Sequence, residues 1–136
     1  PMPRRTGVGI HNQRLSLVLA VLEKKLRIPF YNQDVYVNVV GGLNIDGTTA
    51  DLGLALALLS SVKNKGISLP KVAIIGEVGL TGEIRPINSI DGLVNDAEQM
   101  GFEYAIIPFR NKDRISNESI KVIGVSNLRE AIGKVF

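Results

Sequence analysis

The chain contains no cysteine and only one histidine, His11, among its 136 residues. Without cysteine there is no disulfide and no thiolate metal site, and a single histidine leaves no cluster with the spacing of metal ligands. A lone histidine without a cysteine or a second histidine to act with is more often a surface or capping residue than a catalytic one. We therefore expect no metal and no cofactor in this chain.

Long apolar runs are also missing. No stretch approaches the roughly 20 residues that a membrane-spanning helix needs, and the first residues lack the apolar run of a secretory signal. These absences predict a cytoplasmic protein with no membrane partner. The residues present, 45% hydrophobic and 21% charged, are typical of one globular domain. The net charge of +3 is compatible with nucleic acid binding but too small to indicate it alone.

The first half of the chain carries clear periodic patterns. Residues 1–5 have no core-facing pattern, so we interpret them as the end of a linker and residues 6–136 as the domain. A helix is predicted from Asn12, its N-cap, to just before Pro29, because its apolar residues recur at helical spacing. Alternating valines predict a half-buried strand over 34–40. Residues 52–62 have hardly any polar face, which predicts a helix buried on most sides.

The second half predicts smaller elements. Residues 72–75 form a short apolar strand, and the turn residues 79–82 before Glu83 indicate a hairpin. The remaining patterns predict a helix at 90–100, strands at 104–108 and 121–125, and a helix at 127–135. There is no internal repeat. The order of elements predicts an α+β domain with helices packed on a mixed sheet.

Two glycine-rich pieces invite a phosphate-loop interpretation, residues 7–9 and Gly41-Gly42. Neither is followed by the Lys-Ser/Thr pair of a P-loop or by the full glycine spacing of a dinucleotide site. We interpret both as turns or bulges.

Three segments together resemble successive motifs of Lon-type protease domains. They are residues 37–42 (VNVVGG), 46–52 (DGTTADL) and 76–87 (GEVGLTGEIRPI). The resemblance covers nearly the whole chain and is most specific to the carboxy-terminal Lon-protease-like domain of the RadA (Sms) family of bacterial DNA repair proteins. It implies the Lon-protease-like fold, which is related to domain 2 of ribosomal protein S5.

The resemblance also implies where a peptidase would carry its catalytic pair. Lon-type peptidases use a Ser nucleophile and a Lys base, because a hydroxyl needs a neighbouring base to take its proton. Aligned residue by residue, Thr49 stands at the nucleophile and Asp91 at the base. A carboxylate is far too weak a base for an alcohol at neutral pH. We therefore predict no catalytic residue and no peptidase activity, and expect Thr49 and Asp51 to cap the helix that follows them.

Basic residues are concentrated early in the chain. Arg4, Arg5 and Arg14, with Lys24 and Lys25 at the end of the first predicted helix, are candidates for contacts to DNA phosphates. Arg85 on the predicted hairpin is a further candidate. The alternative is that all six are solvated charges, with Lys24 and Lys25 favoured by the helix dipole. The residues alone leave both interpretations open.

The resemblance implies a function in DNA repair and recombination, in which the family forms an ATP-driven ring on DNA alongside the RecA recombinase. The zinc finger and ATPase of that family cannot reside in these residues, which contain no cysteine and no P-loop. What remains is a scaffold domain that assembles a homo-oligomeric, hexameric ring and contacts DNA. A degenerate peptidase with residual activity and a protein-binding adaptor are the alternatives.

Overall fold

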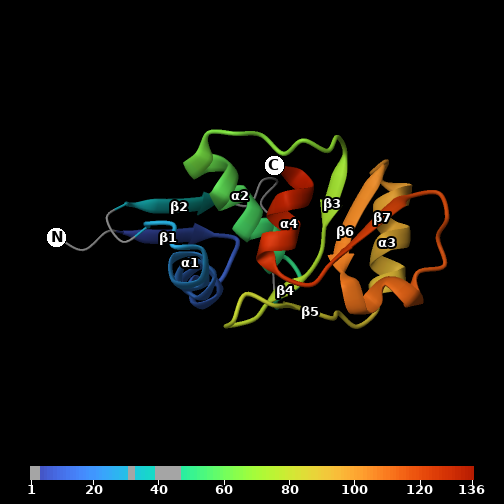
Figure 1. Cartoon of the computed structure of the whole chain (residues 1–136), viewed down its shortest axis with the longest axis horizontal. Coiled ribbons are helices and arrows are strands. Elements are labelled where there is room, and N and C mark those ends of the chain that lie inside the picture. The colour runs from blue at the N-terminus through green and yellow to red at the C-terminus, as the bar shows by residue number, and fades with distance from the viewer. Residues whose placement is uncertain (1–3, 31–32, 39–46) are drawn as a thin grey trace.

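The computed structural model describes residues 4–30, 33–38 and 47–136 (Figure 1). The turn or bulge predicted at Gly41-Gly42 and the last two residues of the strand predicted over 34–40 therefore lie outside the described residues. The described elements are, in chain order, β1 (Arg5–Val8), α1 (Asn12–Leu26), β2 (Val35–Asn38), α2 (Asp51–Lys63), β3 (Val72–Ile74), β4 (Glu77–Val78), β5 (Ile84–Arg85), α3 (Ile90–Gln99), β6 (Tyr104–Pro108), the 3-10 helix η2 (Phe109–Arg114), β7 (Lys121–Val125) and α4 (Leu128–Val135).

The described strands form three small sheets rather than one. β1 and β2 pair in parallel, β3, β6 and β7 form a parallel sheet in that order, and β4 and β5 form an antiparallel hairpin. The α+β class is confirmed, but the single mixed sheet that we predicted is wrong. The chain leaves the β3 sheet at Gly76, whose N–H and C=O bond to the loop and first turn of α2 instead of to a strand.

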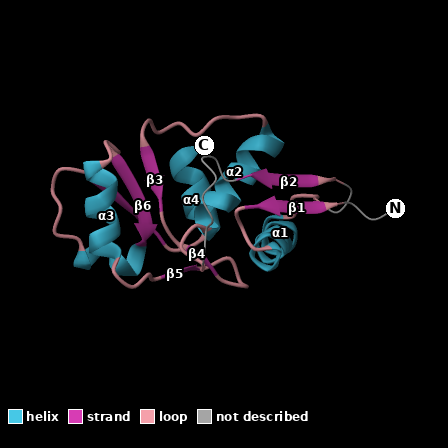
Figure 2. Cartoon of the chain, turned by 180° about the vertical axis from the view of Figure 1, so that it is seen from behind, coloured by secondary structure: helices cyan, strands magenta, loops and turns pink. Residues whose placement is uncertain are grey.

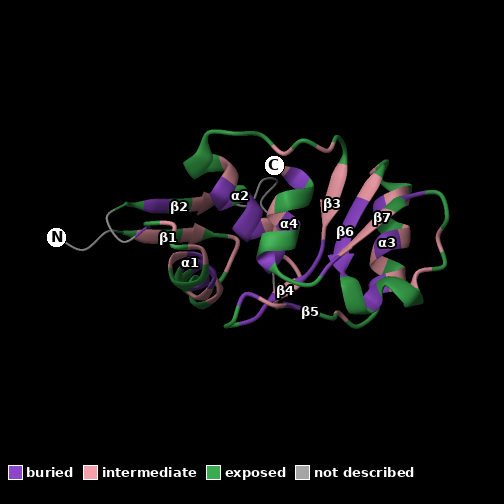
Figure 3. Ribbon diagram, viewed as in Figure 1, coloured by how far each residue is buried: buried purple, intermediate pink, exposed green. Residues whose placement is uncertain are grey.

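The two parallel sheets lie at opposite ends of the molecule. Figure 1 shows β1, β2 and α1 at one end, β3, β6, β7 and α3 at the other, and α2 and α4 between them; Figure 2 shows the same order from behind. Within β6, Ile106 packs in the cluster that contains α4, whereas Ala105 and Ile107 pack in the cluster that contains α3. Both faces of β6 are therefore covered, which explains its uninterrupted apolar sequence (Figure 3).

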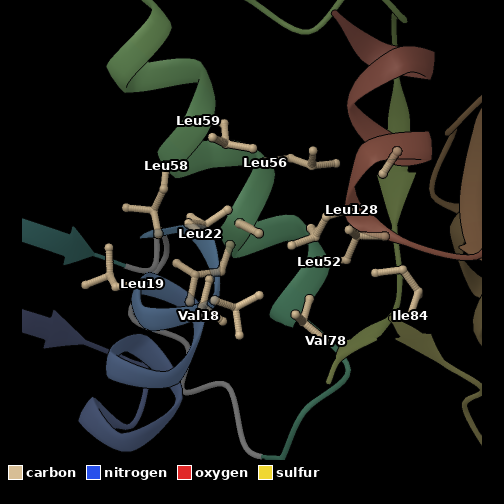
Figure 4. Close-up of a cluster of buried hydrophobic side chains, with 14 of the residues drawn as sticks. Val18, Leu19, Leu22, Leu52, Leu56, Leu58, Leu59, Val78, Ile84 and Leu128 are labelled. Carbon is tan, nitrogen blue, oxygen red and sulfur yellow. The ribbon is translucent and has the colours of Figure 1, made fainter. Parts of the chain in front are cut away.

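The larger core lies between α1 and α2 (Figure 4). The apolar stripe of α1 turns Leu15, Val18 and Leu22 onto α2, where all three are fully buried. Helix α2 is buried along most of its length, as its sequence predicts. No helix among the described residues is long and apolar enough to cross a membrane.

Two local predictions near the amino terminus are wrong. Residues 5–8 form strand β1, although we assigned Arg5 to a linker and Gly7-Val8-Gly9 to a turn; only Gly9, with a φ of 85°, lies at a bend. The strand has only four residues, and its parallel partner begins thirty residues later at Val35, so its sequence carries no local signal. The N-cap of α1 is His11, not Asn12, and no side chain caps that helix. The 3-10 helix η2 was also not predicted.

Asp51 is a buried charge that joins three elements. Its side chain, at the start of α2, is only 2% exposed. It accepts hydrogen bonds from the Arg14 guanidinium of α1, through Nε at 3.2 Å and also through a second nitrogen, and from the Val78 N–H of β4 at 3.1 Å. The hydrogen bonds from Arg14 to Asp51 are the largest cause that raises the pKa of Arg14 above its usual value. A buried carboxylate is tolerated only when it is paired and hydrogen-bonded in this way.

Asp51→Ala should therefore destabilise the domain by about 3 kcal/mol, because it leaves the Arg14 cation and the Val78 N–H without their acceptor. Asp51→Asn, which keeps an oxygen for Val78, should cost less. Asp96→Ala removes an exposed carboxylate from α3 and should change stability by about 0.5 kcal/mol or less. Urea unfolding measures all three. Equal midpoints for Asp51→Ala and Asp96→Ala would refute this account of Asp51.

Candidate functional site

The two motif segments of the sequence meet where α2 begins. The Thr48 hydroxyl donates to Glu77 Oε2 at 3.0 Å, and the Thr49 carbonyl accepts from the Gly76 N–H at 2.9 Å. The Leu52 N–H in turn donates to the Gly76 carbonyl at 3.0 Å. Gly76 has to be glycine, because a Cβ there would lie 2.9 Å from a methyl carbon of Ile84. The segment before α2 is thus fastened to the β3–β4 connection.

The predicted capping role of Thr49 and Asp51 is wrong. The N-cap of α2 is Ala50, and no side chain caps this helix. Thr49 contributes its backbone carbonyl to the bond with Gly76. Asp51 turns its carboxylate toward Arg14 and Val78 because these partners satisfy a buried charge better than one N–H of its own helix would.

Asp91 is held by a different part of the fold from Thr49. It stands in the first turn of α3 and accepts hydrogen bonds from Ser116, from the N–H at 2.9 Å and from the hydroxyl at 3.1 and 3.0 Å. Both carboxylate oxygens are therefore engaged with the loop that follows η2. Within the described residues, no hydrogen bond joins Thr49 to Asp91.

Two glycines and Glu83 hold the turn of the hairpin β4–β5. The turn closes through the Gly79 N–H, which donates to the Glu83 carbonyl at 2.9 Å, and Gly82 takes a positive φ of 83°. Glu83 accepts from the Thr81 hydroxyl at 2.6 Å and from its N–H, and the Thr81 hydroxyl is the main cause that lowers the pKa of Glu83. Glu83 therefore stays ionised beside Arg85.

Three of the six basic candidates are engaged within the domain. Arg5 donates to the Phe30 carbonyl at 2.6 Å and to the Gln33 carbonyl. Arg14 is bound to Asp51. Arg85 forms ion pairs with Glu83 at 3.5 Å and with Glu77 at 4.0 Å.

The other three candidates, Arg4, Lys24 and Lys25, have exposed side chains that form no ion pair with another described residue. An ion pair between Arg5 and Glu23 places the start of β1 beside the last turns of α1, so these three cations come from neighbouring segments. A fourth basic residue, Arg129, belongs to this group and was not predicted from the sequence. Arg129 of α4 donates to the Lys25 carbonyl at 3.2 Å across 104 residues of sequence, and no local pattern indicates that contact.

Lys25 and Arg129 share a hollow of about 340 Å³ with Thr81 and Gly82 of the hairpin turn. Two side-chain carbons of Lys25 lie 3.8 and 3.9 Å from the position of a Cβ added at Gly82, so the two residues are in van der Waals contact. In the described part of the chain, no three His, Cys, Asp or Glu side chains lie close enough to hold a metal ion.

Comparison with known proteins agrees with the motifs. The family model described as subunit ChlI of Mg-chelatase matches residues 6–111, which is more than half of the chain. The chain is 44% identical to the DNA repair protein RadA of Halalkalibacterium halodurans, 46% to that of Haemophilus influenzae and 41% to that of Escherichia coli K12. Each alignment covers 96% of this chain and 28% of the relative, so the chain spans under a third of those proteins.

The RadA alignments extend to both halves of the domain, beyond the three segments that first suggested the resemblance. The chain therefore belongs to the family described as subunit ChlI of Mg-chelatase, and its similarity to the RadA proteins confirms the resemblance that its motifs predicted.

Proposed function

We propose that this chain is a non-proteolytic, Lon-like scaffold domain of a RadA-type DNA repair ATPase, which supports ring assembly and contacts DNA. The non-proteolytic part of this proposal rests on the identity and the hydrogen bonds of Asp91. It stands where Lon-type peptidases place a Lys, and both of its oxygens accept hydrogen bonds from Ser116. Asp91 acts as a structural link between α3 and the loop after η2.

The chemistry of peptide hydrolysis supports the same conclusion. A general base has to reach the hydroxyl proton within about 3 Å and has to be basic enough to take it. Thr49 and Asp91 share no hydrogen bond in the described structure, and a carboxylate is a weak base. The Thr49 segment instead fastens α2 to Gly76.

The purified chain should therefore not cleave unfolded casein, and Thr49→Ala should leave that result unchanged. The double change Asp91→Lys with Thr49→Ser restores both residue types and is the minimum needed before activity could appear. Release of acid-soluble peptides from labelled casein is the measurement. Cleavage by the unmodified chain that disappears in Thr49→Ala would sink the non-proteolytic assignment.

The DNA contact is proposed for exposed cations rather than for all six sequence candidates. Arg5 and Arg14 already bind carbonyl and carboxylate oxygens, so a phosphate would have to displace those partners. Lys24 and Lys25 are exposed at the end of α1, and Arg129 lies beside Lys25. Phosphate contacts position a protein on DNA without reading sequence, which suits repair at any site.

Lys24→Gln with Lys25→Gln should weaken DNA binding and lower the slope of log affinity against log salt by about 0.9 for each phosphate that the protein no longer neutralises. A mixed-sequence duplex measured by fluorescence anisotropy at several salt concentrations gives the slope. The matched control is Lys63→Gln with Lys134→Gln, which removes the same charge from two other exposed helix positions. Identical slopes for the wild type and both double variants would place the DNA path elsewhere.

Ring assembly is proposed from the resemblance to Lon-type and RadA domains, which implies a closed ring. A closed ring of identical subunits uses two different faces of each subunit. We expect a protein that joins this chain to its ATPase to sediment as a hexamer with nucleotide bound and to act alongside the RecA recombinase. Analytical ultracentrifugation tests the assembly. A species that stays monomeric at micromolar concentration with nucleotide present contradicts it.

A further inference from the structure

A cavity of about 650 Å³ opens between β5 and η2. Its lining includes Arg85 and Pro86 on one side and Phe109 and Arg110 on the other. The volume falls within the range of about 300–1,000 Å³ that is usual for small-ligand sites. Phe109, one of four phenylalanines in the chain, is 51% exposed.

The two walls of this cavity are fixed to each other. The Asn111 side chain, only 1% exposed as a residue, accepts from the Ile87 N–H at 2.9 Å and donates to the Ile87 carbonyl at 3.1 Å. This two-way bond holds η2 against the segment after β5. On the far side, the backbone of Phe109 packs closely on Gly124 of β7. A Cβ added at Gly124 would lie only 3.1 Å from the Phe109 Cα. Phe109 is therefore presented on a rigid support.

The cavity is lined by two carboxylates and two guanidinium groups, so its formal charges balance. Glu77 and Glu83 line it, but both pair with Arg85 and each accepts from a threonine hydroxyl. Arg110 is exposed and forms no ion pair with another described residue. An exposed aromatic ring therefore lines the cavity together with a guanidinium group that forms no ion pair in the described part of the chain.

We propose that this cavity binds one nucleotide of single-stranded nucleic acid, with the base stacked on Phe109 and the adjoining phosphate held by Arg110. Stacking on an exposed aromatic side chain next to basic residues is how proteins bind single strands without sequence preference. An acidic peptide would use Arg110 but would gain little from the phenyl ring, so the exposed ring favours a ligand that carries a base. The inference rests on the proposed DNA contact and adds a base-binding site to it.

The first test uses fluorescence, because the chain contains no tryptophan. Phe109→Trp introduces a single fluorophore that preserves an aromatic face. Titration with a 20-mer of oligodeoxythymidine should quench its emission, because a base stacks on the indole. A 20-mer of abasic deoxyribose phosphate carries the same charge without bases and should leave the emission unchanged.

The second test separates stacking from charge. Phe109→Leu should weaken binding of the thymidine 20-mer about 10-fold without changing the salt slope. Arg110→Gln should lower the slope by about 0.7, the value for a single-strand phosphate contact. The matched controls are Tyr36→Leu, an exposed aromatic on β2, and Arg114→Gln, an exposed cation at the end of η2. Both should bind as the wild type does.

The outcomes distinguish this site from the proposed function. If the wild type binds DNA in a salt-dependent manner but Phe109→Leu binds equally well and no quenching occurs, the base site is refuted and the phosphate contacts stand. If the wild type binds no DNA at all, both proposals fail. Quenching by hexaglutamate but not by the oligonucleotide would make the cavity a peptide site and overturn the inference.

Discussion

The buried carboxylate of Asp51 constrains most of the surrounding structure. A charge that is 2% exposed persists in a fold only if its partners stay in place, so Arg14 of α1 and the Val78 N–H of β4 have to be held against the start of α2. Val78 belongs to the hairpin whose other strand carries Arg85. The packing of α1 on α2 and the position of the hairpin are therefore linked through one side chain, and a change at Asp51 is expected to reach the cavity beside β5.

The segments that resemble peptidase motifs form hydrogen bonds to other parts of the chain. In a peptidase, the segment before α2 and the segment after the hairpin would have to leave a hydroxyl and a base free to meet. Here the Thr48 hydroxyl bonds Glu77, the Thr49 carbonyl bonds Gly76, and Asp91 bonds Ser116. Each bond fastens two parts of the chain that are distant in sequence. The first two bonds fasten the start of α2 to the β3–β4 connection, and the third fastens α3 to the loop after η2.

Sequence patterns predicted the elements that depend on their own periodicity and missed the features that depend on distant partners. The apolar run of α2 and the strands β6 and β7 were predicted within one residue of their bounds, because burial repeats along them. In the sequence, Arg14 and Lys24 look alike, because each is a cation on the same predicted helix. Arg14 differs only because it binds Asp51, which lies 37 residues away in the sequence. β1 and the contact of Arg129 with Lys25 were missed for the same reason. The capping prediction for Asp51 was wrong because it considered only the local helix.

The hairpin β4–β5 connects the two surfaces proposed to meet nucleic acid. Its turn residues Thr81 and Gly82 line the hollow with Lys25 and Arg129, and its second strand lines the cavity that contains Phe109. A net charge of +3 is too small to locate such a surface, because acidic side chains neutralise much of the basic charge within the fold. Lys25 and Arg129 line the hollow at the hairpin turn and Arg110 lines the cavity beside β5, and none of the three forms an ion pair with another described residue. A single strand crossing this hairpin would meet phosphate contacts at one side and a stacking ring at the other, so affinity would depend on salt at both surfaces and on bases at only one.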